Sequence, residues 1–447
     1  MFSQMLGSLR SGGRKGVALR GTAWTTIGFV VSYGVRLVST LILTRLLAPE
    51  AFGLMSLAMV FVTGMQMLSD VGTVPSIIRS KRGDDPVFLR TAWSIQLVRG
   101  GLLCLGLIAI SWPVSHAYSE PMLFPLLIAL ALNPLLQGTI SIAVASCQRH
   151  TDLKWITLQD AGGQILATII NILIAWWLGS VWALVVGVLA GTAFRVFLSY
   201  YYLPQRVKSG WQWERQALDE IVKFGRWILL GTLFTYLGGQ GSVAITGFLV
   251  PVETLGLFAI ATTFSGAVNA LLQKIMNQVA FPAMARIHQD DPEKLSAAVG
   301  KLKKMILIII LPSFLLLSVG ARPLVDFLYD PRYAEAGVFL SFTALNMAIA
   351  TMGMPYQNAL LTTGNSRAHS MVMGTWVAIR MLAIAIGFWA YDFIGVLIAT
   401  GIGGVLIFGV TVWLARRSGR AHFRYDILGL SLIFVFYLYA WSQVAYA

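Results

Sequence analysis

Apolar runs of about 18–26 residues, each separated from the next by a short polar segment, fill most of this sequence. A helix needs about 20 apolar residues to cross the hydrocarbon core of a bilayer. Strands of a membrane barrel would instead alternate over about ten residues, and the runs do not alternate. The pattern therefore predicts an all-α, polytopic membrane protein. Charged residues make up 12% of the chain, about half the share in soluble proteins, which argues against a soluble enzyme or a disordered chain.

The runs predict twelve clear transmembrane helices and a weaker thirteenth segment. The predicted spans are 22–46, 53–77, 89–111, 122–147, 156–178, 181–203, 225–249, 255–280, 304–320, 336–361, 369–390 and 394–415, with the weaker segment at 427–444.

Basic residues predict the orientation. With the N-terminus in the cytoplasm, 25 of the 33 Lys and Arg residues fall in cytoplasmic segments, and only Arg45, Arg322 and Arg332 fall in loops on the other side. Cytoplasmic loops are enriched in Lys and Arg, so the N-terminus is expected inside. The same bias explains the net charge of +14 without nucleic acid as a partner.

The first and seventh spans are similar when the chain is shifted by 203 residues. Twelve of 51 positions are then identical, including Trp24 with Trp227 and Glu50 with Glu253. Six spans separate the two copies, so both halves have the same orientation. We expect two six-helix lobes related by a parallel repeat, 1–208 and 209–447, the second also carrying the weaker segment. Such lobes are suited to rocking around a site at their interface.

Five basic residues lie inside predicted spans, where each one costs roughly 2.5–3.5 kcal/mol if nothing relieves it. Arg36, Arg99 and Arg380 lie near the middle of their spans, and for them substrate binding competes with structural ion pairing. Arg195 and Lys274 lie nearer the cytoplasmic ends, where their long side chains can reach the headgroups instead.

Two acidic residues, Asp70 and Asp160, also lie within spans. One interpretation is that each neutralises an arginine at similar depth, for example Asp160 with Arg195. The other is that they titrate and couple transport to an ion.

Polar residues recur at helical spacing in four spans and predict stripes that line one cleft. Small polar residues can also simply hold helices together. The charges break the repeat, since Gly239 matches Arg36 and Gln273 matches Asp70, which favours a functional cleft. The uncharged candidates for substrate binding are Ser32, Gln66, Asn269 and Gln273.

The sequence predicts no cofactor and no metal site. The five histidines have no metal-ligand spacing, and there is no nucleotide-binding loop or nucleophile motif.

Several motifs, in this order, resemble those of the polysaccharide transporters. They are Thr44–Gly53, Ser69–Gly72 with Ile77–Arg79, Gln278–Pro282, Phe327–Asp330 with Tyr333, and Leu360–Asn365. The chain is similar along nearly its whole length to the oligosaccharide (O-antigen and exopolysaccharide) flippases of the multidrug, oligosaccharidyl-lipid and polysaccharide exporter superfamily.

This resemblance implies a flippase that moves an undecaprenyl-diphosphate-linked oligosaccharide across the bacterial inner membrane by alternating access. Its partners would be this lipid-linked substrate, membrane lipids and other polysaccharide-assembly proteins. Arginines suit a diphosphate because a guanidinium can bind phosphate oxygens bidentately.

Three alternatives remain open. A drug or organic-cation antiporter would need a negative cavity, for which only Asp70 and Asp160 are available. A membrane-bound sugar polymerase or ligase would need a sizeable outside loop, and a scaffold would need no transport site.

Overall fold

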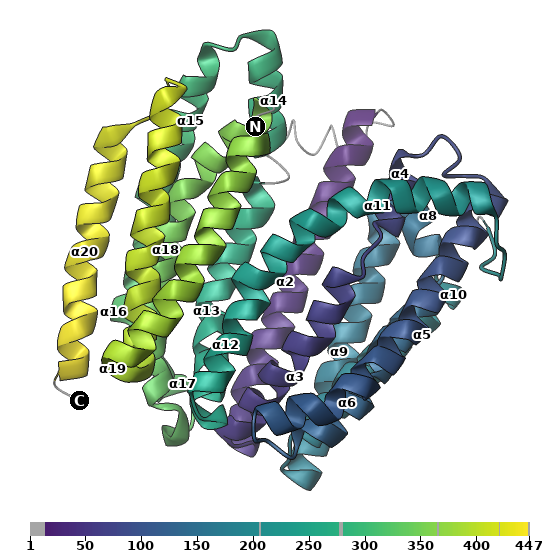
Figure 1. The fold of residues 1–447 in the computed structure, drawn as a ribbon, viewed down its shortest axis with the longest axis horizontal. Coiled ribbons are helices and arrows are strands. Elements are labelled where there is room, and N and C mark those ends of the chain that lie inside the picture. The colour runs from purple at the N-terminus through teal and green to yellow at the C-terminus, as the bar shows by residue number, and fades with distance from the viewer. Residues whose placement is uncertain (1–13, 205–206, 277–279, 364–365, 420, 446–447) are drawn as a thin grey trace. The chain divides into compact units, whose positions relative to one another are not determined.

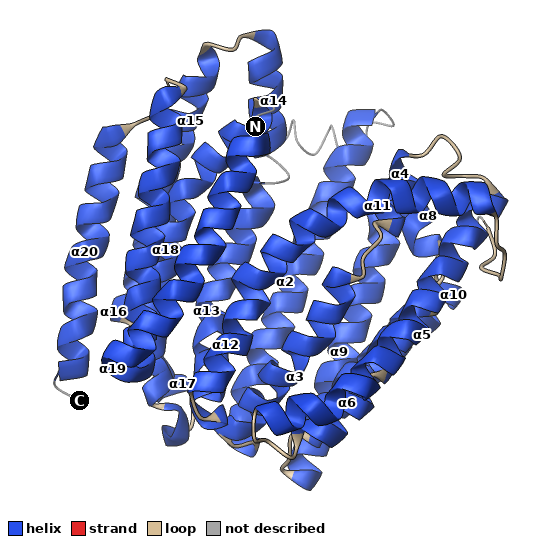
Figure 2. Cartoon of the chain, in the orientation of Figure 1, coloured by secondary structure: helices blue, strands red, loops and turns tan. Residues whose placement is uncertain are grey.

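The computed structural model describes residues 14–204, 207–276, 280–363, 366–419 and 421–445. Within these ranges every regular element is a helix and none is a strand (Figure 2), which confirms the predicted all-α class. Outside the described residues lie parts of the N-terminal tail, of the loop between the two predicted lobes and of two motifs, among them Arg10, Arg206, Val279 and Asn365. The chain forms two compact units, 1–236 and 237–447.

In the first unit, α9 packs against both α2 and α10, while α5 packs against α6 and α7. Its helices in chain order (Figure 1) are α2 (Arg14–Leu46), α3 (Pro49–Leu68), α4 (Thr73–Arg79), α5 (Pro86–Ala117), α6 (Leu123–Leu130), α7 (Leu132–Gly138), α8 (Ala143–Arg149), α9 (Leu153–Leu178), α10 (Trp182–Tyr201) and α11 (Arg215–Tyr236).

In the second unit, α18 is the central helix, packed against α13, α16, α17, α19 and α20. The helices of this unit are η1 (Leu237–Gly241), α12 (Ser242–Leu249), α13 (Val252–Ile275), α14 (Phe281–Asp290), α15 (Lys294–Met305), η3 (Ile306–Ile310), α16 (Leu311–Val319), α17 (Ala321–Leu328), η4 (Pro331–Tyr333), α18 (Glu335–Thr362), α19 (Ser366–Arg417) and α20 (Phe423–Ala445).

Among the described residues, ten helices are long and apolar enough to cross a membrane, or eleven if one bent pair is a single span. This confirms a multi-pass membrane protein but does not reproduce the predicted count of twelve and one. The weaker segment 427–444 belongs to α20, which is long and apolar enough to span. Predicted spans 369–390 and 394–415 both lie in α19, whose backbone leaves helical values at Tyr391 and Asp392.

Several predicted spans are not continuous α-helices: 53–77 is divided between α3 and α4, 304–320 contains the π-helical turn η3, and two others are broken as follows. Segment 122–147 is divided among α6, α7 and α8, with a bend of 58° before α8. Pro134 lies in the first turn of α7, where it lacks the N–H that would continue α6 as one helix. Segment 225–249 runs through α11 and α12, which are joined by the π-helical turn η1, and that turn contains three glycines.

The break between the first two helices recurs 203 residues later. α2 ends at Leu46 and α3 begins at Pro49, while α12 ends at Leu249 and α13 begins at Val252. This local agreement supports the repeat, whereas the two-lobe architecture and its division at residue 208 stay predictions.

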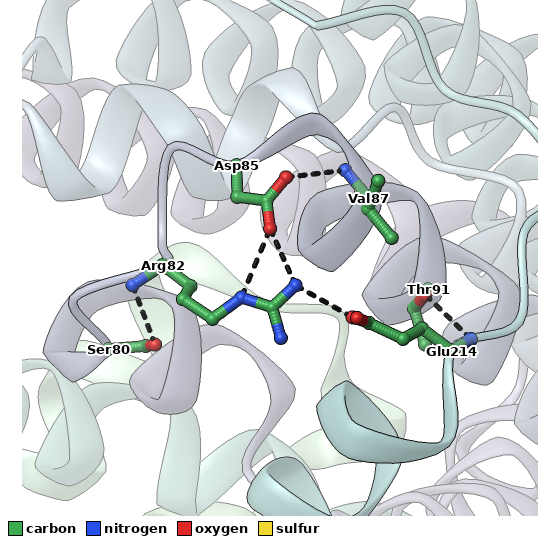
Figure 3. Close-up of polar contacts among 6 residues, drawn as sticks. All are labelled: Ser80, Arg82, Asp85, Val87, Thr91 and Glu214. Carbon is green, nitrogen blue, oxygen red and sulfur yellow. Dashed lines mark hydrogen bonds and ion pairs between the residues drawn. The ribbon is translucent and has the colours of Figure 1, made fainter.

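The segment 207–214, which connects α10 to α11 and which we call the connecting segment, is hydrogen-bonded to other parts of the first unit. The amide of Ile142 donates to Ser209 Oγ over 3.0 Å, and the amide of Gln212 donates to Ser94 Oγ over 2.9 Å. Arg82 Nη2 lies 2.6 Å from Asp85 Oδ2 and 2.8 Å from Glu214 Oε2, so that Arg82 bridges the two acids (Figure 3). α11 continues this attachment by packing against α3, α4 and α5, which explains why the first unit extends to residue 236.

The Arg82 bridge is charged at neutral pH. The hydrogen bond from Arg82 lowers the pKa of Asp85, and the same hydrogen bond raises the pKa of Arg82. A carboxylate with a lowered folded-state pKa stabilises the fold above its unfolded pKa of about 3.9, and this contribution is lost as the pH falls through the folded value. The attachment of the connecting segment is therefore independent of pH in the neutral range.

We expect Gly225→Ala to destabilise the first unit, because a β-carbon there would overlap the backbone carbonyl of Val71, which cannot move as a flexible side chain can. Overpacking of this kind costs about 1–3 kcal/mol. Gly101→Ala in α5 is the matched control, since its β-carbon would meet no atom within 4 Å. Thermal unfolding in detergent should show a lower midpoint for Gly225→Ala alone, and equal midpoints would contradict the close approach.

Candidate functional site

A break between α3 and α4 places Asp70 inside the first unit. The four-residue motif Ser69–Gly72 forms this break, and Gly72 has a φ of 63°, in the left-handed region that glycine adopts without steric cost. The amide of Gly72 donates to Asp70 Oδ1 over 3.0 Å, which fixes the carboxylate at the turn. The motif therefore ends one helix, starts another and orients an acid.

Arg99 of α5 binds to this break with three of its nitrogens. Nε donates to Ser69 Oγ over 2.9 Å, and Nη1 forms an ion pair with Asp70 Oδ1 at 3.4 Å. Nη2 donates to the carbonyl oxygen of Gln66 in the last turn of α3. Arg99 thus caps a helix end as well as neutralising Asp70, in agreement with the interpretation that Asp70 pairs with an arginine.

A cavity of about 280 Å³ lies beside this ion pair, and we call it the Arg99 cavity. Within the described part of the chain, Asp70 and Arg99 are the only charged residues that line it. Its polar lining is completed by Gln66, Thr73, Gln96, Gln137 and Ser141. These residues come from α3, α4, α5, α7 and the loop before α8, so the break in the predicted span 122–147 contributes directly to the cavity.

Arg36 is exposed on α2 and lies away from the apolar exposed surface of that helix. The exposed Ile27 lies nine residues earlier, about two and a half turns away and therefore on the opposite side of the helix. Ser32, which is half-buried, lies nearer the arginine side. Among the described residues, no ion pair or side-chain hydrogen bond of Arg36 is found, so its charge is available to an anion.

Arg380 of α19 has polar and aromatic neighbours but no acidic partner among the residues that the structure describes. Its Nε donates to Ser242 Oγ over 2.7 Å, and its guanidinium carbon lies 5.9 Å from the centroid of the Trp376 ring. Leu382, two residues further on, is 62% exposed and therefore lies on nearly the opposite side of the helix. Arg380 thus also lies away from the apolar exposed surface.

The remaining predicted site residues lie on α9, α10 and α13. Arg195 packs against Gly163, and its Nε is buried without a hydrogen-bond partner in the described part of the chain. Asp160 is exposed, and no ion pair with Arg195 within 4 Å is found among the described residues. On α13, Asn269 and Lys274 are half-buried and Gln273 is exposed.

Sequence reasoning missed a buried charged pair in the second unit. Lys303 is one of the 25 basic residues that the orientation assigns to cytoplasmic segments, but it lies in α15 with its side chain 2% exposed and is paired with Asp426, whose side chain is 5% exposed. Lys303 Nζ also donates to the Met352 carbonyl over 2.9 Å and lies 4.4 Å from the centroid of the Tyr356 ring. Both charges lie next to predicted span ends, so hydropathy alone gave no signal of their burial.

A family model described as "Polysaccharide biosynthesis protein" matches residues 42–338. The chain is 23% identical over 343 residues to the lipopolysaccharide biosynthesis protein WzxC of Escherichia coli, covering 77% of this chain and 69% of that protein. It is 21% identical over 414 residues to the succinoglycan biosynthesis transport protein ExoT of Rhizobium meliloti, covering 90% of this chain and 81% of that protein.

Solved transporters share the fold. The structure of the lipid II flippase MurJ in an inward closed conformation superposes with a TM-score of 0.71 at 13% identity, over 94% of this chain and 92% of that one. The structure of a multidrug resistance MATE family transporter of the MOP superfamily, in an inward-facing conformation, superposes with a TM-score of 0.70 at 14% identity. The superposition covers 90% of this chain and 95% of that one. The family match covers well over half of the sequence and agrees with the resemblance seen in the motifs, so the chain belongs to the family of polysaccharide biosynthesis proteins.

Proposed function

We propose that this protein is a flippase that moves an undecaprenyl-diphosphate-linked oligosaccharide across the bacterial inner membrane by alternating access. The observation that carries the substrate class is the pair Arg36 and Arg380. Each lies in a long apolar helix on the side away from the exposed apolar surface, and no acidic partner is recorded for either among the described residues. Helices of this kind tolerate a cation where a polar ligand compensates it.

In this proposal the arginines bind the diphosphate, because a guanidinium donates two parallel hydrogen bonds to phosphate oxygens. Arg195 and Lys274 add positive charge along the route of the headgroup. Ser32, Asn269 and Gln273 offer hydrogen bonds to sugar hydroxyls. Arg99 and Gln66 belong to the Arg99 cavity, where Asp70 offsets the charge of the arginine.

Asp160 is the acid that we propose for ion coupling, since Asp70 is held by Arg99. Asp160→Asn should then weaken the response of flipping to an imposed proton or sodium gradient, while substrate binding is retained.

The test of the proposed function is reconstitution. Purified protein in proteoliposomes should expose a fluorescent undecaprenyl-diphosphate oligosaccharide to an external reagent faster than protein-free liposomes do. An organic-cation dye serves as the competing substrate. Transport of the dye without movement of the lipid-linked sugar would replace the flippase by a cation antiporter.

The orientation gives a further prediction, for which exposed Lys208 and Ser119 are suitable positions. Lys208→Cys and Ser119→Cys, each in a background without Cys104 and Cys147, should react with an impermeant thiol reagent from opposite sides of the membrane. In intact spheroplasts we expect labelling of residue 119 but not of residue 208. Ser209 is less suitable because its hydroxyl is hydrogen-bonded to the Ile142 amide. Labelling of both residues from outside would refute the cytoplasmic assignment of the connecting segment.

A further inference from the structure

Two residues that line the Arg99 cavity carry buried polar atoms without a hydrogen-bond partner in the described part of the chain. Thr73 is 5% exposed, and its Oγ1 makes no hydrogen bond within the described ranges. The same holds for Nε2 of Gln66, and both residues line the cavity. Buried polar groups are nearly always hydrogen-bonded, so a ligand or ordered water in the cavity could supply the partner that each of these two atoms lacks.

We propose that the Arg99 cavity binds one neutral sugar residue of the lipid-linked substrate through the hydroxyl groups of that sugar. This inference rests on the proposed flippase function and assigns to the first unit a recognition site separate from that for the diphosphate.

The charge of the cavity favours a neutral ligand. Arg99 and Asp70 are the only charged residues of its lining among those the structure describes, and they form an ion pair with each other. A diphosphate would have to compete with Asp70 for the guanidinium and would lie against a carboxylate. A neutral hydroxylated ligand meets neither penalty, and the other polar groups of the lining are amides and hydroxyls.

The hydrogen-bonding groups of the cavity suit hydroxyls, which both donate and accept. Gln66 Nε2 and Thr73 Oγ1 are available as donors. Gln96 Nε2 donates to the backbone carbonyl of Gln137 over 3.0 Å, and Gln137 Nε2 donates to Asn133 Oδ1 over 2.8 Å. Because these bonds hold both amide groups in place, their side-chain oxygens remain as oriented acceptors.

The size of the cavity limits what can enter it. Its volume of about 280 Å³ lies just below the roughly 300–1,000 Å³ of small-molecule sites. One sugar ring fits this space, whereas the oligosaccharide and the polyprenyl chain must remain outside.

The test compares two lipids that differ only in the sugar. The affinity of the purified full-length protein is measured for undecaprenyl diphosphate and for the same carrier bearing a neutral hexose tetrasaccharide. We expect the wild-type protein to bind the sugar-bearing lipid at least about tenfold more tightly, and Thr73→Val to remove about tenfold of that preference, since a lost hydrogen bond leaves a buried sugar hydroxyl unpaired. Binding of undecaprenyl diphosphate should not change.

Two further variants keep the result interpretable. Gln66→Met removes the second donor at similar side-chain size and should reduce the same preference. Thr168→Val is the matched control, because Thr168 is also buried with an unpartnered Oγ1 but lies in α9, outside the cavity lining. It should leave both affinities unchanged and reveal any general effect of replacing a buried threonine in this unit.

Each outcome decides a different point. Equal wild-type affinities for the two lipids would overturn the sugar site while leaving diphosphate recognition intact. An unchanged preference in both cavity variants would also overturn it and assign the unpartnered atoms to bound water. A wild-type protein that binds and flips neither lipid would instead refute the proposed function itself.

Discussion

Lys303→Met is expected to lower the free energy of unfolding by about 3–5 kcal/mol, the usual cost of leaving one charge of a buried ion pair without its partner. The substitution keeps the length of the side chain but removes the cation that faces Asp426. The Asp426 side chain is 5% exposed, and its other recorded hydrogen bond comes from the Tyr356 hydroxyl over 2.8 Å. One neutral donor does not replace the ammonium group.

The double variant Lys303→Met/Asp426→Leu distinguishes charge from packing. Replacing both members of a buried pair by apolar residues is often neutral or stabilising, so we expect it to recover most of the lost stability. Asp291→Ala is the control in the same unit, since its ion pair with Lys294 is largely exposed and should contribute little to stability. The measurement is denaturant-induced unfolding in detergent. A double variant as unstable as the single one would show that the pair is required for more than neutralisation.

The same experiment tests how α20 is attached. Asp426 lies at the start of α20. Near the middle of the helix, the Tyr437 hydroxyl donates to Asn346 Oδ1. Near the end, Arg322 Nη2 donates to the backbone carbonyl of Gln443 over 2.6 Å. These contacts fasten α20 along the second unit. We therefore expect protease cleavage within 423–445 to rise in Lys303→Met before the rest of the unit is cleaved.

Hydropathy predicted the spanning helices well because the bilayer requires a long apolar run wherever the chain crosses. It could not predict where such a run is broken. Segment 122–147 contains Pro134 and polar residues at 137–141 near its break, but how the chain bends before α8 also depends on tertiary contacts. The packing of Gly138 against Gly100 of α5 is one such contact.

The candidate site could likewise be predicted only in part from the sequence. A charge inside an apolar run is visible in the sequence, which is why Arg36, Arg99, Asp70 and Arg380 could be named as candidates. Their partners were not visible, because the pairing of Arg99 with Asp70 depends on how α5 meets the break after α3. Lys303 and Asp426 were missed for the opposite reason, since each lies where a polar loop was expected and is buried by helices from elsewhere in the chain.

The double variant Arg36→Ala/Arg380→Ala is expected to weaken binding of undecaprenyl diphosphate by about 100-fold or more and to abolish flipping. Each charge-assisted hydrogen bond to phosphate contributes about 1.5–3 kcal/mol, which corresponds to roughly tenfold or more for each arginine. Arg99→Ala is left out of this variant, because Arg99 also caps α3 and its loss would confuse binding with folding. Lysine at both positions should restore binding only in part, since an ammonium group lacks the bidentate geometry of guanidinium.

Arg45→Ala is the matched control for this prediction. Arg45 lies in the same helix as Arg36 and is also exposed, but it follows by nine residues and therefore lies on the opposite side of α2. If positive charge on α2 acted only through a general attraction of anions, the two single variants would weaken binding equally. If Arg36 contacts the phosphate, its removal should lower affinity about tenfold while Arg45→Ala stays near wild type. Wild-type flipping by a well-expressed Arg36→Ala/Arg380→Ala protein would refute the assignment of both arginines to the diphosphate.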